Sequence, residues 1–399
     1  MKNLFHSLPF RLILALIIGI ALGFIVNETV MQIVITLQKI LGQIIMFAIP
    51  LVILGFITPS ITKLGNSASK ILGIALGIAY VSTICAAFMS MLAGYGIIPY
   101  LNIVSNVEEN RELPRVIFEL TIPQIMTVMS ALVLALFIGL AAVWTKAKLF
   151  ISLLDEFQKI VIAVVTTIII PLLPFFIGCT FCELTYEGTI TKQLPVFIIV
   201  ILIVMLGHYI WLTVLYAVAG AYSGKNPLRV LKHYGPAYLT AVGTMSSAAT
   251  LPVALDCANK AADEGALRKD MAAFGIPLFA NVHLCGSVLT ETFFVMVVSK
   301  ILYGTFPAPE TMVLFCLLLG IFAIAAPGVP GGTVMASLGL IISVLGFDAN
   351  GTALMLTIFA LQDSFGTACN VTGDGALTLI LTGFVEKHHL KEQNLTVDL

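Results

Sequence analysis

The chain consists largely of long apolar runs, and several are long enough to cross a lipid bilayer. A membrane-spanning helix needs about 20 predominantly apolar residues. Of the 399 residues, 59% are hydrophobic and only 10% are charged, whereas a soluble protein carries about 25% charged residues to cover its surface. This composition excludes a soluble enzyme, a nucleic-acid-binding protein and a disordered scaffold. We predict an all-α, polytopic integral membrane protein.

The apolar runs predict eight transmembrane helices. The first run could also be a signal peptide, but residues 23–27, Gly-Phe-Ile-Val-Asn, form a poor cleavage site. We therefore expect this run to be a transmembrane helix. The eight spans lie near residues 9–27, 30–62, 70–101, 116–145, 150–182, 194–222, 271–301 and 352–385.

Two further apolar stretches, 236–258 and 311–346, contain breaks. The first is interrupted by Gly-Thr-Met-Ser-Ser at 243–247, and the second by Ala-Pro-Gly-Val-Pro-Gly-Gly-Thr at 326–333. Glycine and proline here leave backbone groups free at membrane depth, where irregular backbone is tolerated only if protein or a water-filled cavity covers it. We predict two re-entrant helical hairpins, with a kinked ordinary span as the alternative. Interrupted segments in corresponding halves of a chain point to a transporter's binding site.

Lysine and arginine concentrate in alternate loops, as the positive-inside rule requires. With the N-terminus inside, the outer loops hold only Arg111, Arg115, Lys192 and Lys300. The alternation holds only if both hairpins return to their side of entry, the first from inside and the second from outside. We therefore expect both termini in the cytoplasm and the protein in the plasma (cell inner) membrane.

Polar residues in the last span mark a candidate site. Asp363, Thr367, Asn370 and Asp374 follow one another at spacings of four, three and four residues, so they share one helical face. A carboxylate at the bilayer centre costs about 2.5–3.5 kcal/mol on insertion scales and is functional by default. The alternative is a polar stripe that holds helices together.

The seventh span carries a second polar face, with His283, Ser287 and Glu291 at i, i+4 and i+8. His283 alone could be a packing residue. Glu291 is harder to explain in this way, because its span contains no basic residue near it.

No segment has the motif of a nucleotide-binding, hydrolytic or zinc site. The pair Cys179-x-x-Cys182 lacks a second pair or a histidine cluster to support metal binding. We expect no enzyme and no cofactor, and a transport process driven by an ion gradient or by the substrate's own gradient. A channel and an intramembrane protease are the competing classes, but no paired catalytic residues support the protease.

Three motifs resemble the glutamate transporter family, the dicarboxylate/amino acid:cation symporters. Met-Ser-Ser-Ala-Ala-Thr-Leu-Pro at 245–252 is similar to the serine-rich first hairpin tip, and Gly-Val-Pro-Gly-Gly at 328–332 to the second tip. Asp363 with Asn-Val-Thr-Gly-Asp at 370–374 resembles the substrate- and cation-binding last helix.

The resemblance implies a homotrimer of elevator transporters with inverted repeats. A scaffold would comprise residues 1–65 and 106–190. A transport domain would comprise residues 66–105 and 191–386, and a cytoplasmic tail would follow at 387–399. The implied partners are a small amino acid and the lipid bilayer, without nucleic acid.

The resemblance also implies roles for individual residues. Asn370, Ser246 and Ser247 would bind the substrate α-carboxylate, Asp363 would bind its α-ammonium group, and Asn370 with Asp374 could hold one sodium ion. The second tip would be the outer gate. The further residues expected to line the substrate site are Ser287, Val329, Pro330, Gly331, Gly366 and Thr367.

Departures from the family pattern shape the expected specificity and coupling. The sodium motif Asn-Met-Asp-Gly-Thr is replaced by His-Leu-Cys-Gly-Ser at 283–287, and imidazole and thiol are poor sodium ligands. The arginine that would bind an acidic side chain is replaced by Gly366 in the last helix and Met245 in the first tip. We expect a neutral amino acid, with space for its side chain at Gly366.

For coupling we favour protons, carried by Glu291 first and His283 second. Eukaryotic glutamate transporters, which this chain resembles, carry a proton-binding glutamate at the position of Glu291. Sodium-driven symport of an amino acid or dicarboxylate is the alternative, and ion-independent amino acid exchange is the third.

Overall fold

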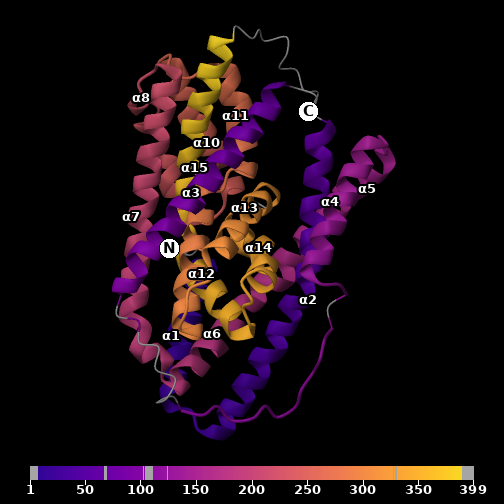
Figure 1. Ribbon diagram of the computed structural model, residues 1–399, viewed down its shortest axis with the longest axis vertical. Coiled ribbons are helices and arrows are strands. Elements are labelled where there is room, and N and C mark those ends of the chain that lie inside the picture. The colour runs from indigo at the N-terminus through magenta and orange to yellow at the C-terminus, as the bar shows by residue number, and fades with distance from the viewer. Residues whose placement is uncertain are drawn as a thin grey trace.

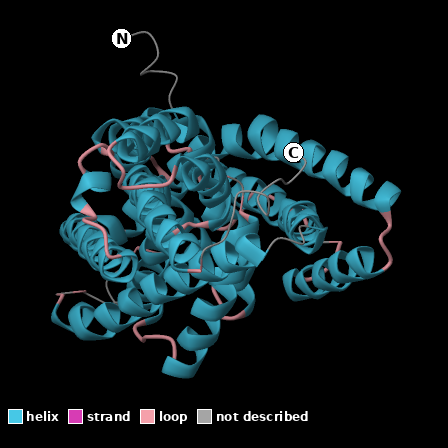
Figure 2. Ribbon diagram, turned by 90° about the horizontal axis from the view of Figure 1, so that it is seen from above, coloured by secondary structure: helices cyan, strands magenta, loops and turns pink. Residues whose placement is uncertain are grey.

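The computed structural model describes residues 8–66, 70–101, 103, 111–123, 125–326, 328 and 330–388. Within these ranges the chain is helical apart from turns and one irregular segment between 111 and 127, and no strand occurs (Figure 2). The all-α prediction is confirmed. The α-helices are α1 (Leu8–Ile25), α2 (Glu28–Asn66), α3 (Lys70–Ile97), α4 (Val128–Trp144), α5 (Lys148–Val164), α6 (Ile170–Glu187), α7 (Thr189–Ser223), α8 (Leu228–Leu231), α9 (Gly235–Thr244), α10 (Ser247–Asp263), α11 (Lys269–Val282), α12 (Cys285–Tyr303), α13 (Pro309–Ala325), α14 (Gly332–Ser343) and α15 (Ala349–Lys387).

Six helical stretches of the described chain are long and apolar enough to cross a membrane. The helices α1 and α4, with 18 and 17 residues, are apolar and close to the minimum length for a span. A π-helical segment, Val165–Ile169, joins α5 to α6 within one continuous stretch. The six stretches are Glu28–Pro59, Ile71–Tyr100, Lys148–Glu187, Val196–Ser223, Lys269–Tyr303 and Leu354–Lys387.

The prediction of a helix from residue 116 is wrong, because α4 begins only at Val128. Proline has no N–H group and disfavours helical backbone before it, and Pro123 interrupts this apolar run. Side chains of α2 satisfy the extended backbone instead: Ile117 N donates to Thr36 Oγ1 (3.0 Å) and Ile122 N to Gln43 Oε1 (2.7 Å). Apolar composition alone could not reveal this pairing.

Both interrupted stretches form helical hairpins, as predicted. In the first, α9 ends at Thr244, and the next residue, Met245, has a left-handed φ of 52°. Ser246 caps α10 by accepting a hydrogen bond from Ala249 N (3.1 Å). In the second, α13 and α14 flank a turn that ends at Gly331 (φ 70°), a conformation suited to glycine. Each break therefore lies within the predicted interruption, although Gly243 is helical and Met245 takes the left-handed conformation in the first hairpin.

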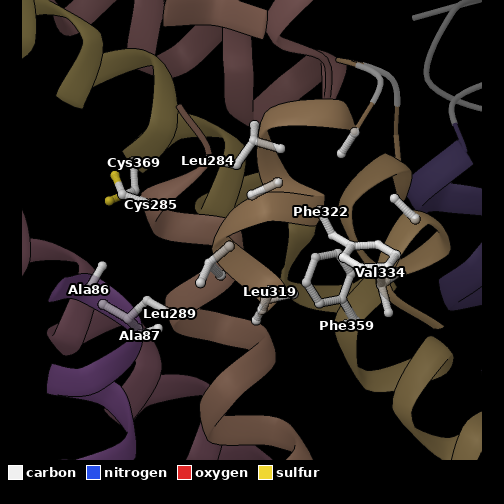
Figure 3. Close-up of a cluster of buried hydrophobic side chains, with 14 of the residues drawn as sticks. Ala86, Ala87, Leu284, Cys285, Leu289, Leu319, Phe322, Val334, Phe359 and Cys369 are labelled. Carbon is white, nitrogen blue, oxygen red and sulfur yellow. The ribbon is translucent and has the colours of Figure 1, made fainter. Parts of the chain in front are cut away.

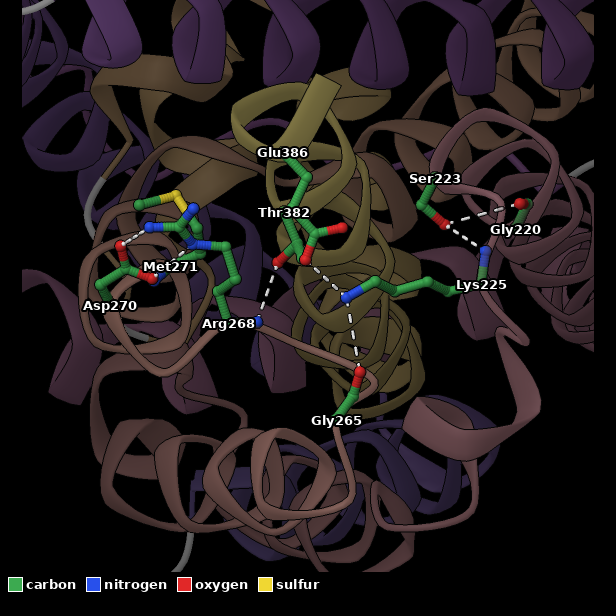
Figure 4. A network of polar contacts seen from close by, with 9 residues as sticks. All are labelled: Gly220, Ser223, Lys225, Gly265, Arg268, Asp270, Met271, Thr382 and Glu386. Atoms are coloured by element: carbon green, nitrogen blue, oxygen red, sulfur yellow. Dashed lines mark hydrogen bonds and ion pairs between the residues drawn. The ribbon is translucent and has the colours of Figure 1, made fainter. Parts of the chain in front are cut away.

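The first hairpin begins and ends at the same end of the molecule. Lys232, before α9, forms an ion pair with Glu264, after α10 (2.6 Å), which holds the pKa of Glu264 below its ordinary value. Figure 4 shows that Lys225 contacts both the Gly265 carbonyl (3.4 Å) and Glu386 near the end of α15 (2.7 Å). This end lies at the top of Figure 1.

The second hairpin begins and ends at the opposite end. Tyr303, before α13, donates from its hydroxyl to Asp348 Oδ1 (2.8 Å), and Asp348 caps the start of α15. Because α15 has 39 residues, its two ends are about 55–60 Å apart at 1.5 Å per residue. The hairpins thus enter from opposite ends of the bundle.

The helices pack in two groups. In the first group α1 packs on α6, while α2 contacts α4, α5 and α6; the second group comprises α3, α7 and α9–α15. Figure 3 shows the core of the second group, where Leu289 of α12, Leu319 and Phe322 of α13, and Phe359 of α15 are buried together. Contacts between the groups run mainly through α14 and α15.

This geometry predicts where the loops of the first hairpin meet water. In a cysteine-free background, we expect Arg229→Cys and Asn259→Cys to react with a membrane-impermeant maleimide only after the cytoplasmic face is opened. Both positions are exposed, and the positive-inside rule places them inside. Glu112→Cys is the control expected to react from outside. Labelling of Asn259→Cys from outside would contradict the re-entrant hairpin.

Candidate functional site

The polar face of α15 lies at the centre of the second helix group. Asp363, Thr367, Asn370 and Asp374 are all buried, as their spacing predicted. Thr367 donates from its hydroxyl to Asp363 Oδ1 (3.4 Å). Among the described residues, neither aspartate forms an ion pair with a lysine or an arginine.

The seventh span is broken, which corrects the prediction of one continuous helical face. The helix α11 ends at Val282, His283 and Leu284 are not helical, and α12 starts at Cys285. Ser287 and Glu291 remain one turn apart on α12, but His283 is outside that periodicity. The break leaves the first N–H groups of α12 without partners inside the helix.

Asn370 supplies partners for those N–H groups. Its Oδ1 accepts hydrogen bonds from Gly286 N (2.7 Å) and Ser287 N (3.2 Å), and its Nδ2 donates to Ser287 Oγ (2.9 Å). The two lone pairs of the amide oxygen are thereby occupied. In this conformation, Asn370 stabilises the start of α12.

His283 lies in the break and is fully buried between α3 and α15. Its Nδ1 is 3.0 Å from Asp374 Oδ1, and its Nε2 is 2.9 Å from Ser82 Oγ. A neutral imidazole can donate to Asp374 and accept from Ser82, and an imidazolium can donate to both. The structure therefore brings His283 and Asp374 together, whereas Asn370 is engaged with α12.

Glu291 lies apart from this pair, at the contact between α12 and the second hairpin. Its side chain is fully buried, and Ser337 of α14 donates a hydrogen bond to Oε1. Its other oxygen, Oε2, has no hydrogen-bond partner among the described residues. Glu291 is thus the acidic group of α12 that contacts the predicted outer gate.

The two hairpin tips meet above Asp363. Ser246 donates from its hydroxyl to the Gly328 carbonyl (2.6 Å), and Gly331 N donates to Asp363 Oδ2 (2.7 Å). Ser247 is buried in the first turn of α10. Pro330 lies in the second tip, and Val329 lies outside the described residues. The second tip therefore contacts the polar face of α15, and the first tip contacts the second.

Gly366 does not face open space, which corrects the expectation that its missing side chain leaves room. A Cβ atom at this position would lie 3.3 Å from Ser287 Cα and 3.4 Å from Ser287 N. The glycine allows α15 to approach the backbone of α12 closely. Space for a substrate side chain must come from another wall.

Sequence reasoning missed several polar partners. Ser82 forms a hydrogen bond with His283, and Ser337 forms one with Glu291. Single serines in apolar runs give no distinctive signal in the sequence. His208 of α7 is buried, and its Nε2 lies 2.9 Å from Thr290 Oγ1 and 3.1 Å from the Gly286 carbonyl. A histidine inside a span was a visible signal, but its partners depended on the break before α12.

Two opposed hairpins whose tips meet over a buried polar helix define the architecture of a secondary membrane transporter. The sodium:dicarboxylate symporter family matches residues 8–384. The chain belongs to this family, which confirms the resemblance seen in the motifs. The description of this family is that of symporters.

Curated relatives support the same assignment. Excitatory amino acid transporter 2 of Mus musculus is 26% identical over 231 residues, which cover 56% of this chain and 39% of that protein. Neutral amino acid transporter B(0) of Homo sapiens is 24% identical over 268 residues, covering 66% of this chain and 48% of that protein. Excitatory amino acid transporter 3 of Mus musculus is 30% identical over 168 residues, covering 42% and 30%. The chain matches less than half the length of each relative.

The contacts of Asn370 predict a stability effect. Asn370→Ala removes the acceptor for two buried N–H groups, and we expect a loss of about 1–3 kcal/mol. Asn370→Asp keeps an acceptor, and its negative charge suits a helix N-terminus, so it should lose less. The measurement is thermal unfolding of the purified protein in detergent. Equal midpoints for Asn370→Ala and wild type would contradict the capping role.

Proposed function

We propose that the protein is an ion-coupled symporter of a neutral amino acid that works by an elevator mechanism. The observation that carries this proposal is that the first hairpin tip bonds to the second, and the second bonds to Asp363. A substrate held at this face of α15 would be enclosed by elements that enter from opposite ends. Each tip could then uncover the substrate toward one side of the membrane.

An amino acid suits the chemistry of this face. Asp363 is a buried carboxylate without a lysine or arginine partner among the described residues, so an α-ammonium group would supply its missing cation. An α-carboxylate could take over N–H groups at the start of α10, which Ala248 and Ala249 now donate to the Gly328 carbonyl (3.3 Å) and to Ser246 Oγ (3.1 Å). Asn370 would join them only by releasing α12.

A neutral side chain is favoured over an acidic one. Met245 and Gly366 supply no cation, and an unpaired carboxylate in a buried pocket is costly. The name of the human relative describes a neutral amino acid transporter, which agrees with this choice. The alternative, transport of an acidic amino acid or dicarboxylate, draws on the family description and on the excitatory amino acid transporters.

For coupling, we favour protons carried by Glu291. One of its oxygens contacts Ser337 in the gate and the other has no partner among the described residues, so a proton can bind next to the moving element. His283 is the second candidate. Sodium held by Asn370 and Asp374 is the alternative, supported by the family description, and ion-independent exchange is the third.

The two helix groups suit the scaffold and transport domain of an elevator. The group around α2 would remain fixed, within a homotrimer, while the group around α15 slides with its substrate. Few elements join them, mainly α14 and α15. We place the protein in the plasma membrane with both termini in the cytoplasm, and its partners are the amino acid and the bilayer.

Uptake into proteoliposomes tests the substrate. With an ion gradient imposed, we expect concentrative uptake of neutral amino acids, and we expect unlabelled aspartate and succinate to compete poorly. Asp363→Asn should raise the half-saturation concentration about tenfold or more, because a charged hydrogen bond is worth about 1.5–3 kcal/mol. Tight binding of aspartate or succinate without competition by neutral amino acids would overturn the proposed specificity.

A pH gradient tests the coupling ion. We expect an inside-alkaline gradient without sodium to drive uptake in the wild type, and Glu291→Gln to lose this response while still exchanging internal for external substrate. Glu183→Gln is the matched control, since Glu183 is a buried acid of α6 in the other helix group. Uptake that needs sodium and ignores the pH gradient in all three proteins would exclude proton coupling.

A further inference from the structure

A cavity lies between the two helix groups, away from the site on α15. Its volume is about 220 Å³. The helices α2 and α6 form one side and the first turns of α15 form the other. The lining residues are Gln38, Lys39, Gly42, Gln43, Ile45, Phe176, Thr352 and Leu356.

Two buried polar groups of this cavity lack partners. Gln38 and Thr352 are each only 3% exposed, and Gln38 Nε2 and Thr352 Oγ1 form no hydrogen bond with any described residue. Most buried polar groups in folded proteins are hydrogen-bonded, so two such atoms lining one cavity, from α2 and α15, are unusual. Both can donate a hydrogen bond to a ligand.

Lys39 adds a positive charge to these donors. Its ammonium group has three N–H donors and forms no ion pair with a described carboxylate. The buried Glu183 of α6 is within electrostatic reach of Lys39 but does not line the cavity. Lys39 therefore remains available to a ligand in the cavity.

The rest of the wall is apolar apart from Gln43, whose Oε1 already accepts from Ile122 N (2.7 Å). Ile45, Phe176 and Leu356 are buried, and Gly42 contributes no side chain. A second cavity, also about 220 Å³, shares Lys39 and Gln43 and is lined by Glu119. The carboxylate of Glu119 disfavours an anion there, so the charge pattern directs an anion to the first cavity.

We propose that the first cavity binds a compact amphipathic carboxylate, one anionic group on a small apolar body, and that the bound ligand holds the two helix groups together. The carboxylate accepts from Lys39, Gln38 and Thr352, and the apolar body packs on Phe176 and Leu356. Because α2 and α15 contribute opposite walls, sliding of one group past the other would take the cavity apart. This second part rests on the proposed elevator motion, whereas binding itself does not.

Benzoate is a suitable probe, and benzamide is its neutral counterpart of the same shape. Calorimetry on the full-length protein in detergent should show saturable binding of benzoate and at least tenfold weaker binding of benzamide. We expect Lys39→Met, at an exposed position, to weaken benzoate binding at least tenfold and to remove this preference. Thr352→Val should weaken benzoate binding without removing the preference for benzoate over benzamide. Equal binding of both probes, unchanged binding by Lys39→Met, or only unsaturable partitioning would overturn the site.

Transport assays test the second part separately. Benzoate should slow amino acid uptake without raising the half-saturation concentration of the substrate, and this effect should be lost in Lys39→Met. Binding that leaves uptake unchanged would overturn the locking role. If the reconstituted protein transported none of the amino acids tested, the proposed function would fail while the calorimetric result for the cavity would stand.

Discussion

The interaction on which the site depends is the hydrogen bonding of backbone groups that broken helices leave free at membrane depth. No water is available in the hydrocarbon core to bond such groups, so protein must do so. Asn370 accepts from the first N–H groups of α12, Asp363 accepts from Gly331 N in the second tip, and Ser246 donates to the Gly328 carbonyl. The side chains with the strongest functional signal are thus also those that complete the fold.

In the proposed transporter, this dual use would provide a physical link between substrate and gate. The Gly331 N–H group already occupies one oxygen of Asp363, so an α-ammonium group would share that carboxylate with the tip. A ligand and a gate that bind the same group necessarily influence each other's affinity. Ordinary apolar packing would not supply such a link, because it does not depend on the charge of the ligand.

The sequence revealed elements whose causes are local. Glycine, proline and serine mark both hairpin tips. The left-handed backbone of Met245 follows the end of α9, and that of Gly331 precedes the start of α14. Features set by distant partners could not be predicted in this way. The apolar run that begins at residue 116 is long enough for a span, but the backbone N–H groups of Ile117 and Ile122 bond to Thr36 and Gln43 of α2.

The same distinction applies inside the site. The shared face of Asp363 and Asn370 followed from helical spacing, whereas the break at His283 depends on capping by Asn370, a residue 87 positions later in the chain. The tight approach of Gly366 to Ser287 likewise depends on how α12 and α15 cross. A glycine in the sequence shows that a side chain is absent, but it does not show whether the space is left empty or filled by a neighbouring helix.

The positions of the two titratable candidates separate their roles. His283 and Asp374 contact each other and Ser82, so their pair joins α3, the α11–α12 break and α15 within one helix group. None of these elements belongs to a hairpin. Glu291 instead receives its hydrogen bond from Ser337 in α14, an arm of the second hairpin that also contacts α2 and α4 of the other group. An ion coupled to gate opening must change the free energy of the gate relative to the site. Of the two candidates, only Glu291 contacts an arm of the second hairpin, so in the proposed mechanism proton binding there would be linked to opening of that gate. The His283–Asp374 pair would instead hold the site together.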